Sequence, residues 1–134
     1  MLTGWNIILV LKVAVAGLTL LLLTSFVPLA RGKYSLHGRI NVAFAILTLA
    51  ALAGLELLIR VVDPGLFEYL DEPARRALGI HLCFSLPAAV LLPAMLFSGL
   101  THRRRLHLSL AGIFGFFWAG TFLTGVFLLP HNPP

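Results

Sequence analysis

The sequence predicts an all-α integral membrane protein, a four-helix transmembrane bundle with both termini on the outer side of the membrane. The chain of 134 residues is 59% hydrophobic and only 11% charged, with a mean hydropathy of +0.97, which excludes a soluble domain of average composition. It contains four apolar stretches long enough to cross a bilayer, and its basic residues gather in two of the three connections between them.

The four apolar stretches predict the helices in order. A bilayer core requires about 20 apolar residues per spanning helix, and the stretches run at about residues 5–29, 36–62, 74–100 and 106–129. The first is too long for the apolar region of a secretory signal, and Lys12 interrupts it, so we interpret it as a retained helix. Short connections imply that consecutive helices lie antiparallel.

Turn-forming and capping residues bound the second connection, at about residues 63–73. Asp63 followed by Pro64 ends the second helix. An acidic residue before Pro73 begins the third helix, since proline is well tolerated in a first helical turn. The sequence therefore predicts a short acidic loop between two hairpins.

Charge distribution sets the predicted orientation. The basic residues in or beside the first and third connections are Arg31, Lys33, Arg39, Arg103, Arg104 and Arg105, with no acidic residue in either connection. By the positive-inside rule these connections are cytoplasmic, and the acidic loop and both termini are on the outer side, in what we expect to be a bacterial inner (cytoplasmic) membrane. Orientation in the lipid bilayer accounts for the positive charge, so no nucleic-acid partner is expected.

The sequence carries a weak internal repeat. A shift of 70 residues superposes Leu36-His37 on Leu106-His107, each of which follows a basic connection. This pattern favours a duplicated two-helix hairpin. If an axis along the membrane normal relates the two halves, His37 and His107 lie at the same cytoplasmic depth.

His37 and His107 form the first candidate cofactor site. Two imidazoles from different helices can be the axial ligands of a haem or two ligands of a copper ion. At about 100° per residue, Asn41 lies close to His37 on one helix face, and Trp118 lies close to His107 on another. The alternative is that these histidines lie at the membrane interface and contact lipid headgroups.

A second group of polar residues lies toward the outer side and draws on all four helices. Lys12 and Glu56 are each about seven residues from the outer end of their helix, so their matched depth predicts a buried ion pair. Arg60, one turn after Glu56, is the local alternative partner. Ionisable groups within spanning segments are functional candidates. The candidate metal ligands, or members of a proton relay, are therefore Glu56, His81 and His131. The two histidines are also candidate cofactor ligands.

Two features concern helix packing. Ala111, Gly115 and Ala119 recur every four residues and predict a small-residue strip along which another helix approaches closely. Pro87 and Pro93 lie inside the third helix, where each frees a backbone carbonyl and favours a bend.

Several short motifs together resemble a known family. They are His37 at the start of the second helix, His81 through Pro93, Leu106-His107, Trp118 and Thr124-Gly125. This set resembles the YozB/CtaM-like family of small polytopic membrane proteins, some of which take part in the maturation of haem–copper cytochrome oxidases. The resemblance extends from Leu36 onward, and it implies a role in terminal-oxidase assembly carried by His37, His81 and His107. The acidic outer loop departs from the family pattern.

The sequence thus favours an accessory protein of respiratory-complex biogenesis that acts in haem–copper oxidase maturation. It would engage haem, copper or the immature oxidase subunit through its histidines. The chain has no Gly-rich phosphate loop, Ser-His-Asp arrangement or zinc-protease motif, so we expect an accessory factor more than an enzyme. Two alternatives stay open. One is a b-type haem electron carrier or quinol-reactive module, with one haem held by His37 and His107. The other is a small structural subunit of a respiratory or photosynthetic complex.

Overall fold

The computed structural model describes residues 3–68, 70–130 and 132, and every regular element within them is helical. The elements are α1 (Gly4–Thr24), α2 (Phe26–Ala30), α3 (Tyr34–Leu57), η1 (Leu58–Val62), α4 (Glu72–Leu100), α5 (Arg104–Leu123) and η2 (Thr124–Leu128). The short elements η1 and η2 are π-helical turns that end α3 and α5. The described part of the chain therefore confirms the all-α, four-helix prediction.

Four continuous rods result from these elements. They are Gly4–Ala30, Tyr34–Val62, Glu72–Leu100 and Arg104–Leu128, each long and apolar enough to cross a membrane. Their limits lie within two residues of the stretches expected from hydropathy. The outer surface is apolar as well, since Val13, Val90 and Phe127 are 67%, 76% and 74% exposed. A water-soluble bundle would turn such side chains inward.

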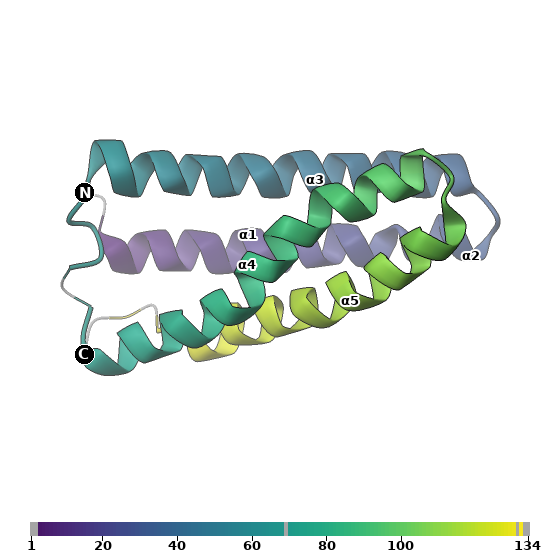
Figure 1. Cartoon of the computed structure of the whole chain (residues 1–134). Helices are drawn as coiled ribbons and strands as arrows, with labels where there is room; N and C mark the ends of the chain where they lie inside the picture. The colour runs from purple at the N-terminus through teal and green to yellow at the C-terminus, as the bar shows by residue number, and fades with distance from the viewer. Residues whose placement is uncertain (1–2, 69, 131, 133–134) are drawn as a thin grey trace.

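The rods form two antiparallel hairpins whose ends define the bundle. The connections at residues 31–33 and 101–103 lie at one end, which we call the turn end, and the connection at residues 63–71 lies at the opposite end, which we call the loop end. In Figure 1, α4 crosses obliquely over α1, so that α4 approaches α3 at the turn end and diverges from it toward the loop end. The hairpin of α4 and α5 is closely packed, whereas α3 and α4 separate.

Side-chain caps fix two helix starts. The Thr3 hydroxyl accepts a hydrogen bond from the backbone N–H of Asn6 at 3.3 Å. The Asp71 carboxylate accepts one from the N–H of Ala74 at 3.0 Å, with Pro73 in the first turn of α4. These contacts confirm the helix start predicted at Pro73.

The two turns share one backbone conformation. Gly32 and His102, 70 residues apart, both have a positive φ, of 71° and 56°, and His102 is the one non-glycine residue in the described chain with this geometry. The residues that follow also match, with φ and ψ of −88° and 68° at Lys33 and −83° and 73° at Arg103. Their N–H groups donate to the carbonyl five residues earlier, at 2.8 and 3.0 Å. The repeat seen in the sequence therefore extends to turn geometry.

An aromatic cluster forms the centre of the bundle. Phe44 on α3 makes edge contacts with Trp118 and Phe114 on α5, at ring-centroid distances of 4.9 and 6.2 Å. Trp118 stacks on Phe114 at 5.8 Å, and its indole N–H donates to the Thr19 hydroxyl on α1 at 3.1 Å. Trp118 thus joins three helices, the role of a packed aromatic.

The small-residue strip predicted on α5 does not mediate the close helix contact. Gly115 and Ala119 are exposed, and a Cβ added at Gly115 would meet nothing within 4 Å. The close approach is at Gly120, where an added Cβ would lie 2.1 Å from Cδ1 of Phe84 on α4. Of the predicted strip, Ala111 packs against the core, whereas Gly115 and Ala119 were wrongly expected to contact another helix of this chain. The face of α5 that packs on α4 is the one that carries Gly120.

Candidate histidine sites and the adjacent cavity

The rings of His37, His81 and His107 are oriented in the same way. In each case the Nδ1 atom bonds to an oxygen that acts as the acceptor, so Nδ1 carries the proton in the neutral ring. The remaining nitrogen, Nε2, then presents a lone pair. Metal-ligating histidines are commonly held in this manner, because the bond at one nitrogen sets the tautomer and orientation of the other.

His37 lies inside the first hairpin, where both nitrogens of its ring are hydrogen-bonded. Its Nδ1–H donates to the Ser25 carbonyl at 2.8 Å, where the chain passes from α1 to α2, and its ring lies 6.3 Å from that of Phe26. The Asn41 amide donates to Nε2 at 3.0 Å. The predicted proximity of Asn41 and His37 is confirmed, and this contact occupies the Nε2 lone pair.

His107 occupies the equivalent position in the second hairpin but keeps Nε2 open. Its Nδ1–H donates to the Met95 carbonyl at 3.0 Å, a sequence separation of 12 residues that matches His37 and Ser25. Ser98 Oγ lies 3.4 Å from the same nitrogen. The ring packs over Gly99, where an added Cβ would lie 3.0 Å from Nδ1 and Cε1. Within the described chain, no hydrogen bond engages Nε2.

His37 and His107 therefore lie in separate hairpins, and each is bonded to a backbone carbonyl of the segment that precedes its own turn. No hydrogen bond or ring contact joins them among the described residues. A permanent haem held by both histidines does not fit this arrangement, because the Nε2 atom of His37 already accepts from Asn41. His107 Nε2, by contrast, takes part in no hydrogen bond among the described residues.

His81 lies near the loop end of the bundle, between α4 and η2. The Thr124 hydroxyl donates to the Gly120 carbonyl at 2.7 Å, and its oxygen accepts from the His81 Nδ1–H at 2.9 Å. The ring lies against Gly125, where an added Cβ would be 3.0 Å from Cε1. Thr124 and Gly125 therefore act together, one holding the ring and the other giving it space.

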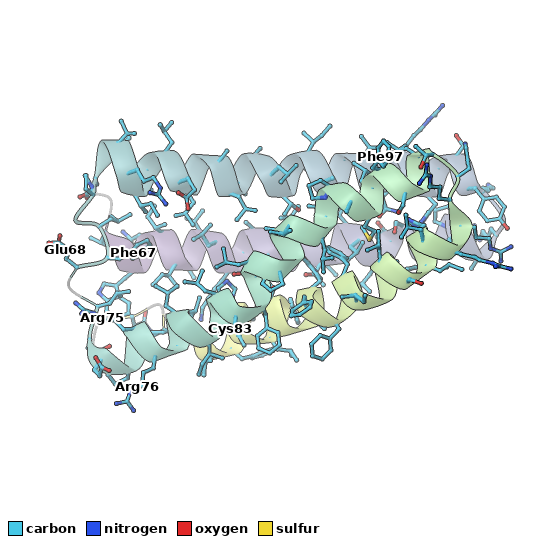
Figure 2. All side chains as sticks on the ribbon, in the orientation of Figure 1. Phe67, Glu68, Arg75, Arg76, Cys83 and Phe97 are labelled. Atoms are coloured by element: carbon cyan, nitrogen blue, oxygen red, sulfur yellow. The ribbon has the colours of Figure 1, made fainter. Side chains whose placement is uncertain are left out.

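A cavity of about 200 Å³ opens beside His81. Its walls come from α1, α3, α4, α5 and η2 and from Phe67, Leu70 and Leu129 outside the helices. Figure 2 shows Phe67 beside the start of α1. Most of its lining is aliphatic, and its polar members include Lys12, Glu56, His81 and Ser85. The cavity occupies the space where α3 and α4 diverge.

Glu56, for which the sequence offered Lys12 or Arg60 as partner, forms the local ion pair with Arg60. Glu56 accepts from Arg60 Nε one turn later, and both side chains are more than half exposed, at 56% and 74%. Such an exposed pair contributes little to stability. Lys12 and Glu56 still line the same cavity, as their matched depth implied.

The proposed metal cluster of Glu56, His81 and His131 is only partly described. His131 lies outside the described residues, and within those residues no group of three or more His, Cys, Asp or Glu side chains is placed to hold a metal ion. His81 and Glu56 both line the cavity, and Glu56 is bonded to Arg60.

Sequence reasoning missed the partners that orient the histidines. Ser25 and Met95 act through backbone carbonyls, which carry no sequence signature. Thr124 was noted only as part of the Thr124-Gly125 motif, without its contact to His81. Ser85 had a usable signal, because it lies four residues after His81 and so shares its helix face. Comparison of the chain with protein-family models, with curated proteins and with solved structures found no match.

Proposed function

We propose that this protein is an accessory factor of respiratory-complex biogenesis that engages haem at the turn end of a membrane-spanning bundle during haem–copper oxidase maturation. In this proposal the turn end is cytoplasmic and the membrane is the bacterial inner membrane. The observation that carries it is the His107 ring, whose Nδ1–H is fixed on the Met95 carbonyl while Nε2 keeps its lone pair. Haem is treated as a cargo, delivered to an immature oxidase subunit, and not as a resident cofactor.

The charges around His107 support an anionic, metal-containing cargo. Arg103, Arg104 and Arg105 are exposed in the turn, and the ion pairs of the described residues involve none of them. Guanidinium groups bind carboxylates through paired hydrogen bonds. A haem bound through its iron at His107 carries two propionates that these arginines can pair with. The positive-inside rule explains why the arginines are in this turn, and the same groups are available to the cargo.

Copper is the less favoured cargo. Copper sites in proteins are built from several nitrogen or sulfur ligands, and the described residues offer no group of three metal-binding side chains. A single imidazole suffices as one axial ligand of haem. An incomplete ligand set also suits transient holding, because the partner subunit can supply the second axial ligand and take the cargo.

Deleting the gene in its own host tests this function directly. We expect the terminal oxidase to lose haem, measured from reduced-minus-oxidised spectra of membranes. Wild-type protein and the matched control His102→Ala should restore the spectrum, whereas His107→Ala should not. Western blotting would establish that the variants accumulate equally.

Two results would contradict the proposal. One is full oxidase haem content in the deletion strain. The other is equal complementation by His107→Ala and His102→Ala. Stoichiometric copurification with a finished oxidase would instead support a structural subunit.

A further inference from the structure

The cavity beside His81 contains two polar groups that no described residue satisfies. The His81 ring bonds to the Thr124 hydroxyl and to the Thr121 backbone. Since Nδ1 holds the proton, Nε2 is a lone-pair acceptor, and no described residue donates a hydrogen bond to it. Ser85 Oγ, one helical turn further along α4, also has none there. In a hydrocarbon environment an unsatisfied polar group is costly, so these two groups favour a ligand that completes them.

The chemistry of the two groups selects a hydroxyl. A single ligand hydroxyl can donate its proton to His81 Nε2 and accept the Ser85 O–H on its oxygen. A carbonyl can accept from Ser85 but cannot donate to the imidazole. A phosphate or carboxylate without a proton has the same defect. The site therefore distinguishes a hydroxyl from the corresponding ketone.

The depth of the site excludes a phospholipid headgroup. His81 is nine residues after Glu72, the first residue of α4, which corresponds to about 14 Å along a helix axis. A charged headgroup stays in the interface, whereas a small uncharged head can enter the hydrocarbon region. The two charged residues of the cavity wall, Lys12 and Glu56, are of opposite sign, so the wall carries no net charge that calls for a charged head. We therefore expect an uncharged ligand head.

The shape and size of the cavity favour a slender ligand. Its volume of about 200 Å³ is below the roughly 300–1,000 Å³ of ordinary small-molecule pockets. Its α4 lining nevertheless extends from Ala74 to Leu92, and its α3 lining from Thr48 to Glu56, so the cavity is elongated along the helices. A single head with an aliphatic tail that leaves toward the lipid matches both properties. Trp118 in the wall provides an aromatic neighbour for a ring.

We propose that this cavity binds a hydroxyl-bearing isoprenoid lipid, namely the quinol form of a membrane quinone. One quinol O–H donates to His81 Nε2, and its oxygen accepts from Ser85. Isoprenoid alcohols share the hydroxyl and the tail, but a phenolic hydroxyl, with a pKa of about 10, is the stronger donor to an imidazole. The site does not include His107, so it stands independently of the proposed haem function.

Equilibrium binding of a short-tailed quinol to the whole protein in lipid nanodiscs tests the proposal. The readout is quenching of tryptophan emission under anaerobic conditions, with the corresponding quinone and a short isoprenoid alcohol as comparison ligands. We expect saturable quinol binding that weakens about tenfold in both His81→Leu and Ser85→Ala, the effect of one lost hydrogen bond. Cys83→Ala is the matched control, because Cys83 is exposed on the same helix and does not line the cavity.

Each possible outcome either supports or overturns the proposed quinol site. Preference for quinol over quinone, lost in His81→Leu and Ser85→Ala but kept in Cys83→Ala and His107→Ala, supports the site. Absence of saturable quinol binding to wild type overturns it, as does equal affinity for quinol and quinone. Isoprenoid alcohol bound as tightly as quinol overturns the choice of a quinol. Ser85→Ala removes a hydroxyl that bonds no described residue, so its result does not depend on a disturbed fold.

Discussion

Replacing Gly120 by alanine tests the packing of α4 on α5. A Cβ at this position would lie 2.1, 2.5 and 2.6 Å from the ring atoms Cδ1, Cγ and Cε1 of Phe84. Carbon atoms in contact are normally about 3.5–4.0 Å apart, so the helix or the ring must shift by more than 1 Å. Phe84 also contacts Phe116 and Phe117, which limits the ring's escape.

The expected cost follows from two opposing terms. Overpacking of a well-packed site costs roughly 1–3 kcal/mol, and replacing glycine by alanine within a helix returns up to about 1 kcal/mol. With that gain subtracted, we expect Gly120→Ala to lower the free energy of unfolding by up to about 2 kcal/mol. The matched control is Gly115→Ala on the same helix, where an added Cβ meets nothing within 4 Å and only the helix-propensity gain remains.

Reversible unfolding by sodium dodecyl sulfate in mixed micelles, followed by far-ultraviolet circular dichroism, measures both variants. Combining Gly120→Ala with Phe84→Leu should recover part of the loss, because the clash needs both partners. If Gly120→Ala is as stable as Gly115→Ala, the reasoning on the α4–α5 contact is refuted.

Three further predictions concern the turns and the histidine supports. Gly32→Ala should destabilise the protein by roughly 1 kcal/mol and His102→Gly should stabilise it by a similar amount, because only glycine adopts a positive φ without strain. The same unfolding assay should show free-energy changes of opposite sign for the two variants. Changes of equal sign would contradict this prediction. Thr124→Val should release the His81 ring, which would be detected as altered imidazole NMR signals. The control is Thr101→Val, which removes an exposed hydroxyl bonded to its own helix and should leave these signals unchanged. Gly99→Ala should displace the His107 ring and weaken haem binding without a change at His81, and unaltered haem affinity would count against the orienting role of the Met95 carbonyl.

The helices were predictable because each is encoded locally. Hydropathy over 20 residues and the Asp71–Pro73 start signal fixed the rods and the start of α4 without any tertiary information. Lys12 and Glu56 were placed at equal depth for the same reason, since rise per residue converts sequence position into height. The actual partner of Glu56 was the nearer one, because Arg60 needs no second helix to reach it.

The candidate site was less predictable because its key contacts are tertiary. His81 and Thr124 are 43 residues apart, and the oxygens that hold His37 and His107 belong to the backbone. Small-residue periodicity pointed to Gly115, but only the rotation of α5 decides that Gly120 faces α4. Periodicity identifies equivalent positions around a helix and does not say which of its faces is covered.

The 70-residue repeat is weak in the sequence but clear in the structure. Only Leu36-His37 and Leu106-His107 match clearly, yet the positive-φ residues, the turn hydrogen bonds and the ring-to-carbonyl bonds all recur at this spacing. The two hairpins differ at Asn41, which satisfies His37, whereas Nε2 of His107 stays open in the described chain. That difference is the physical basis for assigning the two histidines different roles.

Optical titration of haem into the protein purified in mild detergent tests the central claim most directly. Wild type and His37→Ala should give the same saturable Soret shift, and His107→Ala should weaken the affinity by more than about tenfold, the loss of at least 1.4 kcal/mol of binding free energy. Sharp reduced α and β bands lost equally in His37→Ala and His107→Ala would instead establish a bis-histidine haem and contradict the account, as would a titration in which His107→Ala binds haem like wild type.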